Sequence, residues 1–188
     1  PMNEHHASYE ASPAPKNIGD PPTASHRLSC DNAATSFPKP PNTLQAMRDY
    51  AVYIGASAGR GAYSEAQQSA LVLNTCRERL NTLFHGENPN HFIFTLNCTD
   101  ALNLAIHGLL FDSGHAITTW MDHNSVLRPC NALAERRGLA VTHVEVDPVT
   151  CVVDPQDIRK AIRPDTRLIA VVHGSNVTGT IQPIREIG

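Results

Sequence analysis

Residues 168–183, LIAVVHGSNVTGTIQP, carry the strongest indication of the fold. The apolar, mostly β-branched run over 168–172 predicts a buried strand, and the small polar residues over 173–179 predict a loop. Open α/β sheets bind their ligands where strands end in loops of this kind. The stretch therefore predicts an α/β sheet and one candidate binding edge.

Strands and helices alternate along the sequence before this stretch. We expect strands at 92–95, 116–120, 140–146 and 167–172, with helices at 99–111, 126–137 and 155–162 between them. The sequence predicts Thr99 as the N-cap of the first of these helices and Asp154 as the residue that introduces the last. Such alternation is typical of βαβ units with right-handed crossovers, so the fold class is α/β with a mostly parallel sheet.

The N-terminal third of the chain has a different composition. Residues 1–27 hold five prolines and almost no large apolar side chain, which predicts a disordered tail before a single domain over 28–188. Helices are expected at 43–53 and at 64–84, where Ser64 suits the N-cap. The glycine-rich residues 55–61 between them predict a flexible loop.

Composition excludes several classes of function. The chain has 188 residues, 41% of them hydrophobic, and a net charge of −3, so it offers no electrostatic attraction to nucleic acid. No apolar run approaches the roughly 20 residues that span a bilayer, and the N-terminus lacks a secretory pattern. The five cysteines are widely spaced, which favours neither a disulfide framework nor a metal site. We therefore expect a cytoplasmic protein that binds no nucleic acid, membrane or metal.

Three loops at the ends of predicted strands carry the candidate site residues Thr99, His123 and Asn176. Thr99 opens a helix, where it either caps the backbone or donates its hydroxyl to a phosphate. His123 either stacks on a flat ligand or is an ordinary polar loop residue. Asn176 either hydrogen-bonds a ligand or satisfies its own turn. If the strands are parallel, the three loops meet at one edge and together suit a phosphorylated heteroaromatic cofactor.

Five segments in register resemble the cysteine desulfurase family of the class V (fold type I) aminotransferases, which use pyridoxal 5′-phosphate. The segments are DNAATSFPKP at 31–40, GRGAYS at 59–64, and the runs 94–106, 122–129 and 176–184. The resemblance implies a three-layer αβα transferase large domain. Residues 28–188 would form its N-terminal part, so that the domain is incomplete and the small C-terminal domain is missing.

The resemblance also implies roles for individual residues. Cys98 and Thr99 would lie on the loop that binds the cofactor phosphate, His123 would stack on the pyridine ring, and Asn176 would hydrogen-bond the phenolic oxygen. Asn32, Ala33 and Arg60 would lie on the substrate side. The implied enzyme is a homodimer that converts L-cysteine to alanine and an enzyme-bound persulfide, whose sulfur passes to an acceptor protein.

The family's covalent chemistry has no counterpart in this sequence. The family's Schiff-base lysine is absent, because Lys16, Lys39 and Lys160 lie at unsuitable positions, and none of the five cysteines occupies the place of the catalytic one. We therefore expect no catalytic residue in the chain, which would be an inactive fragment of such an enzyme. The alternatives are a non-catalytic binding or dimerisation module, and a parent enzyme that is a selenocysteine lyase or another β-lyase.

Overall fold

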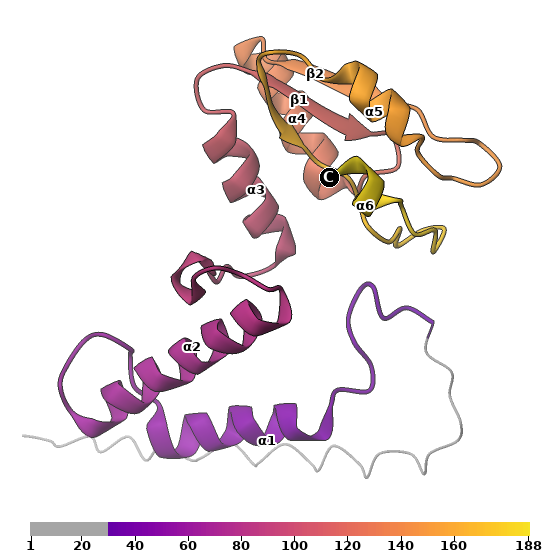
Figure 1. Ribbon diagram of the computed structural model, residues 1–188. Helices are drawn as coiled ribbons and strands as arrows, with labels where there is room; N and C mark the ends of the chain where they lie inside the picture. Colours follow the sequence, from indigo (N-terminus) through magenta and orange to yellow (C-terminus); the bar gives the residue numbers. More distant parts are fainter. Residues whose placement is uncertain (1–29) are drawn as a thin grey trace, which may run out of the picture. The chain divides into compact units, whose positions relative to one another are not determined.

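The computed structural model describes residues 30–188 (Figure 1). The predicted tail over residues 1–27 and its boundary at residue 28 lie outside the described residues. The chain divides into a first compact part that ends at Met47 and a second that runs from Arg48 to Gly188. Each part is described by itself below.

The first part contains a tight turn followed by the start of a helix. The side-chain oxygen Oδ1 of Asn32 accepts a hydrogen bond from the Phe37 backbone N–H at 2.9 Å, which closes the turn. Lys39 Nζ donates to Thr35 Oγ1 at 2.6 Å. Helix α1 then spans Pro41–Asp49, with a proline at its first position, where no intrahelical N–H is needed.

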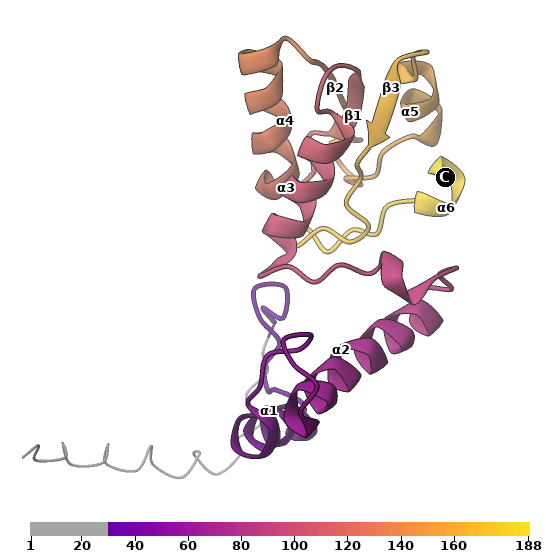
Figure 2. The ribbon, with the colours of Figure 1, turned by 90° about the vertical axis from the view of Figure 1, so that its left-hand side faces the viewer.

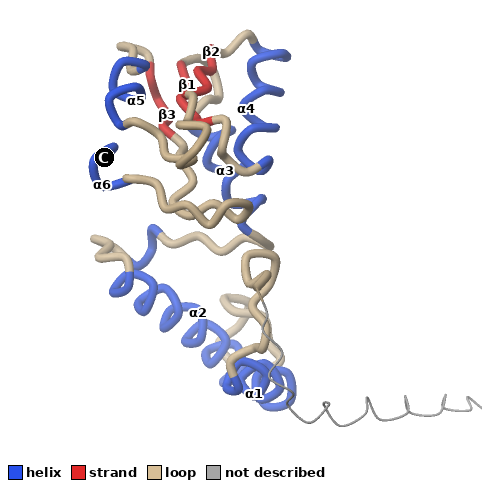
Figure 3. The backbone as a smooth tube through the Cα atoms, turned by 90° about the vertical axis from the view of Figure 1, so that its right-hand side faces the viewer, coloured by secondary structure: helices blue, strands red, loops and turns tan. Residues whose placement is uncertain are grey.

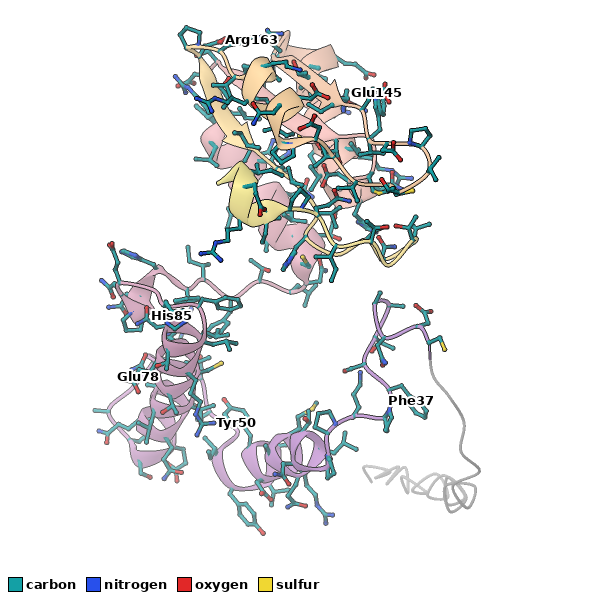
Figure 4. All side chains as sticks on the ribbon, turned by 45° about the vertical axis from the view of Figure 1, so that its right-hand side comes forward. Phe37, Tyr50, Glu78, His85, Glu145 and Arg163 are labelled. Carbon is teal, nitrogen blue, oxygen red and sulfur yellow. The ribbon has the colours of Figure 1, made fainter. Side chains whose placement is uncertain are left out.

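The second part begins with two helical segments joined by a glycine-rich loop. A π-helical turn, Tyr50–Ile54, ends at Gly55, whose positive φ of 54° places it in the left-handed region. The predicted helix at 43–53 is therefore α1 plus this turn. The Tyr50 hydroxyl, labelled in Figure 4, donates to the Ala56 carbonyl at 2.7 Å and lies 2.9 Å from Ser69 Oγ on the next helix.

Helix α2 spans Ser64–Leu83, as the sequence predicts to within one residue. The capping role expected for Ser64 is wrong, because Tyr63 occupies the N-cap position and makes no side-chain capping bond. The Ser64 hydroxyl instead donates to the neighbouring Glu65 carboxylate at 2.8 Å.

The strand predicted at 92–95 is wrong. After the short 3₁₀ helix Pro89–His91 the chain is extended, but it pairs with no strand within residues 30–188. A strand needs the backbone groups of a neighbour. Here the Phe92 carbonyl accepts from Arg77 Nε at 3.1 Å, and the Arg77 guanidinium lies 5.1 Å from the centre of the Phe94 ring.

A parallel three-stranded sheet forms the centre of the remaining chain. Its strands β1 (His115–Thr119), β2 (Ala140–Val144) and β3 (Thr166–Ile169) lie in the order β2-β1-β3. Ile117 of β1 is in register with Thr142 on one side and Ile169 on the other. The three strands predicted here are confirmed in place and direction, although each ends one to three residues earlier.

Helices cover both faces of this sheet, as Figures 2 and 3 show. Helices α3 (Cys98–Leu109) and α4 (Asn124–Arg137) pack on one face, and α5 (Pro155–Ala161) packs on the other. Two hydrophobic cores result. In the first, side chains of α3 and α4 pack against Ala116, and in the second, Ile158 of α5 packs in the same cluster as Ile117. The expected three-layer αβα class is therefore confirmed.

The chain ends beside α5 in the short helix α6 (Ile184–Ile187). The expected introduction of α5 by Asp154 is confirmed, since its Oδ1 accepts from the Gln156 N–H at 2.8 Å. Among residues 30–188 no helix is both long and apolar enough to cross a membrane.

Candidate cofactor-binding site

The carboxyl ends of β1 and β3 and the N-termini of α3 and α4 carry the candidate site residues. In a parallel sheet, this edge gathers the loops that follow the strands, together with the positive ends of the helix dipoles. The sheet with its helices is drawn in Figure 2, where α3 and α4 lie side by side.

The N-terminus of α3 is capped by Asn97 and not by Thr99. Asn97 Oδ1 accepts from the Asp100 N–H at 2.9 Å, and the Asn97 carbonyl accepts from Thr95 Oγ1 at 2.8 Å. Thr99 lies in the first turn of the helix, so the interpretation of Thr99 as a mere cap is wrong. The reason is that Asn97 already supplies the oxygen that the backbone requires.

The hydroxyl of Thr99 is consequently available to a ligand. No residue within 30–188 hydrogen-bonds it, and the side chain is exposed. The backbone N–H groups of Cys98 and Thr99 belong to the first turn, which has no intrahelical partners for them. A hydroxyl and two N–H groups at a helix N-terminus form a suitable seat for a phosphate.

His123 occupies the N-cap of α4, and its ring is fixed by Ser125. The Ser125 N–H donates to His123 Nδ1 at 3.1 Å, and Ser125 Oγ lies 2.7 Å from the same nitrogen. Because a backbone N–H can only donate, Nδ1 is the acceptor. The neutral ring therefore carries its proton on Nε2.

Thr99 and His123 line the same open groove, which lies between α3 and α4 and has a volume of ≈ 480 Å³. We call it the α3–α4 groove. Arg128 and Arg136 also line it, and no acidic side chain does. An anionic ligand is therefore favoured there over a cationic one. The remaining lining residues are Asn103, His107, Asn124, Ser125, Pro129 and Ala132.

Asn176 does not line the α3–α4 groove. It lies exposed in a turn in which Ser175 Oγ accepts from the N–H groups of Val177 and Thr178, both at 3.2 Å. An antiparallel bridge between Gly174 and Ile181 closes the loop. The structure thus brings Thr99 and His123 together but leaves Asn176 on a neighbouring loop, with its side chain directed by no hydrogen bond from the described residues.

The other residues of the expected site are not among those that line the groove. Cys98 is exposed at the first position of α3, and Arg60 is exposed in the loop before α2. Asn32 and Ala33 belong to the first compact part, where Asn32 closes its own turn.

The two described lysines are engaged elsewhere. Lys160 forms an ion pair with Asp157 at 2.8 Å on the exposed side of α5, and this hydrogen bond raises the pKa of the lysine. A lysine that attaches a cofactor covalently needs a lowered pKa within the site. Lys39 is bonded to Thr35, and Lys16 lies outside the described residues. No group of three or more metal-binding side chains gathers within residues 30–188.

Two buried polar residues beside the site did not emerge from the sequence. The Asp122 carboxylate accepts four hydrogen bonds, and Gln182 donates to the Cys151 carbonyl while accepting from the Val153 N–H. The paired threonines 118 and 119, four and three residues before Asp122, were the one available signal, because hydroxyls at a strand end need an acceptor when they are buried. The partner of Gln182 lies 29 residues away in the sequence, so no local pattern reveals it.

Comparison with known proteins shows which protein family this chain is similar to. Residues 29–188 match the family model described as Aminotransferase class-V. A probable cysteine desulfurase of Methanothermobacter thermautotrophicus is 35% identical over 158 residues, which cover 84% of this chain and 39% of that protein. The cysteine desulfurase of Rattus norvegicus is 32% identical over 165 residues, which cover 86% and 36%.

Solved structures are similar in fold over the same region. The apo cysteine desulfurase from Thermococcus onnurineus NA1 has a TM-score of 0.74 and 31% identity, with 84% of this chain and 39% of that chain covered. A structure described as SspA in complex with cysteine has a TM-score of 0.76 and 32% identity, with 84% and 45% covered. The chain thus spans less than half the length of these proteins, and the fold is that of the first part of a fold type I transferase domain.

Proposed function

Because the chain belongs to the class V aminotransferase family, we propose that it supplies part of the pyridoxal 5′-phosphate site of a cysteine desulfurase. The reaction would release sulfur from L-cysteine as an enzyme-bound persulfide and leave alanine. One observation carries the proposal: the free hydroxyl of Thr99 and the ring of His123 line one groove that contains arginines and no acid.

Each residue has a specific task in this proposal. Thr99 and the first N–H groups of α3 would hold the phosphate, and Cys98 would contribute its backbone N–H beside it. His123 would lie against the cofactor ring with its Nε2 proton free, because Ser125 occupies Nδ1. Asn176 would reach the ring oxygen, and Asn32, Ala33 and Arg60 would face the substrate. When bound, the cofactor supplies an electron sink that weakens bonds to the substrate carbon.

The covalent steps are assigned to groups other than those of residues 30–188. Lys39 and Lys160 are bonded to Thr35 and Asp157, so we propose that a further polypeptide segment supplies the cofactor-binding lysine and the sulfur-accepting thiol. This chain alone would then bind the cofactor without turning over cysteine.

The relatives support proposals for the substrate and the partners, and the cysteines support one for the location. The related structure that holds cysteine supports a cysteine substrate for the parent enzyme, and the same family supports a homodimer and a sulfur-acceptor protein. All five cysteines are free thiols, which supports a reducing compartment such as the cytoplasm.

A binding experiment tests the phosphate seat without requiring catalysis. Pyridoxine 5′-phosphate, which lacks the aldehyde and forms no covalent bond to lysine, is titrated into the chain by calorimetry. We expect Thr99→Ala to raise the Kd by roughly 10- to 150-fold, since a hydrogen bond to a charged group contributes about 1.5–3 kcal/mol.

Thr99→Ser retains the hydroxyl and serves as the matched control, which should bind as the wild type does. If Thr99→Ala and wild type bind equally well, the phosphate seat does not include Thr99. If the wild type binds no pyridoxine 5′-phosphate at millimolar concentration, the proposed cofactor site is wrong.

A further inference from the structure

Asp122 joins the loop that carries His123 to the loop that carries Asn176. Its Oδ1 accepts from the Val172 N–H at 2.6 Å, although the two residues are 50 positions apart in the sequence. Its Oδ2 accepts from the Thr118 hydroxyl at 2.7 Å and from the Thr119 N–H at 2.7 Å and hydroxyl at 2.9 Å. The side chain is 5% exposed, so these bonds are shielded from water.

The place of this carboxylate in the sheet explains why it is needed. The last backbone bond between β1 and β3 runs from the Ala170 N–H to the Ile117 carbonyl at 2.9 Å. Two residues further, at Val172, the acceptor is no longer the backbone of β1 but the Asp122 side chain. The carboxylate therefore continues the pairing of the two chain segments at the point where they separate to form the site.

The same residue also shapes the turn before His123. The Asp122 N–H donates to the Thr119 carbonyl at 3.1 Å, while the Asp122 carboxylate accepts from the N–H and the hydroxyl of Thr119. His123 follows directly and is fixed on its other side by Ser125. A change at Asp122 therefore moves His123 relative to the loop that begins at Val172.

We propose that Asp122 is a positioning residue that sets the distance between the His123 ring and the 173–179 loop, the two segments whose residues His123 and Asn176 would contact the cofactor ring. The proposal rests on the proposed function for the identity of the ligand. The hydrogen bonds by which Asp122 connects the two loops do not depend on that identity. The four hydrogen-bond donors are all neutral groups, and each bond to the ionised carboxylate is charge-assisted. Asparagine in its place would turn an N–H₂ group towards these donors and lose at least one bond.

The test compares Asp122→Asn with Ile158→Val, a core substitution on the α5 face that lowers stability and leaves the four hydrogen bonds of Asp122 in place. For the ligand-free chains, amide hydrogen exchange at Val172 and the NMR signals of the His123 ring are measured. We expect Asp122→Asn to lose the protection of Val172 and to broaden or shift the His123 ring signals, while Ile158→Val leaves both close to wild type.

Titration with pyridoxine 5′-phosphate then shows whether the Asp122 hydrogen bonds contribute to ligand affinity. We expect Asp122→Asn to raise the Kd by about tenfold or more, since small displacements of binding groups are costly, and Ile158→Val to stay within about twofold. If Asp122→Asn loses the Val172 protection yet binds as Ile158→Val does, the positioning role is wrong. If Asp122→Asn does not fold, Thr118→Val, which removes one hydrogen-bond donor to Asp122, is compared with Ile158→Val in the same measurements.

A chain that binds no pyridoxine 5′-phosphate in its wild-type form refutes the proposed function alone. The positioning role then depends on the ring signals: an unchanged His123 spectrum in Asp122→Asn would overturn it.

Discussion

His115 and His123 lie at the two ends of β1, and their surroundings give them different roles. His115 is fully buried, with Nδ1 2.8 Å from Thr166 Oγ1 and Nε2 2.8 Å from Thr142 Oγ1. Burial lowers the pKa of this imidazole, and the nearby Arg163 guanidinium, labelled in Figure 4, lowers it further. His115 therefore joins three strands as a neutral ring at the edge opposite the site, whereas His123 faces the groove.

The lowered pKa of His115 predicts that the protein loses stability in mild acid. The unfolded ring takes up a proton near pH 6.5, but the folded ring resists it, so stability is complete above about pH 6.5 and falls as the pH decreases below it. The slope for one proton is at most about 1.4 kcal/mol per pH unit. Urea unfolding between pH 5 and 7.5 should show a flatter profile for His115→Gln than for wild type. The exposed His91→Gln is the control, and an equal slope in all three proteins would contradict the prediction.

At the scale of the element, different residues of α3 stabilise the helix and offer a group to a ligand. Asn97 caps the backbone, and Thr99 in the first turn is left free. We expect Asn97→Ala to lower the free energy of unfolding by about 1 kcal/mol and Asn97→Asp to retain it, because both Asn and Asp accept from the same N–H. Thr99→Ala should leave stability unchanged. Chemical denaturation of the three variants distinguishes the roles, and a loss of stability in Thr99→Ala equal to that in Asn97→Ala would show that Thr99 also caps.

The sequence predicts the elements better than it predicts the contacts between them. Hydrophobic periodicity and the Asp154 cap were sufficient for the βαβ alternation and for α5, because both depend on neighbouring residues. The predicted strand at 92–95 has the right composition but no pairing partner in the described chain, and pairing is a property of the fold. Thr99 and Asn97 are both acceptable caps by residue type, so only the backbone geometry chooses between them. The bond from Asp122 to Val172 spans 50 residues and could not be read from either loop alone.

Across the whole molecule, many large apolar side chains remain exposed. On α2 alone, Leu71, Val72, Leu73 and Leu83 are 39–67% exposed, and Leu96, in the extended segment before α3, is 90% exposed. Accumulated exposed apolar surface of this kind marks sites of association. We therefore expect the chain to self-associate in solution, with an average mass that rises with concentration.

Paired substitutions on α2 test this expectation. Val72 and Leu83 are 11 residues apart, about three helical turns, so they lie on the same side of the helix. Val72→Glu combined with Leu83→Glu should reduce the mass measured by analytical ultracentrifugation towards that of the monomer, because charges oppose the burial of this surface. Val149→Glu, at an 87% exposed loop position, is the matched control and should associate as the wild type does. A wild-type chain that stays monomeric at about 100 µM, where weak association becomes measurable, would contradict the prediction. Loss of association in the Val149 control as well would show that added negative charge, and not the apolar side of α2, governs it.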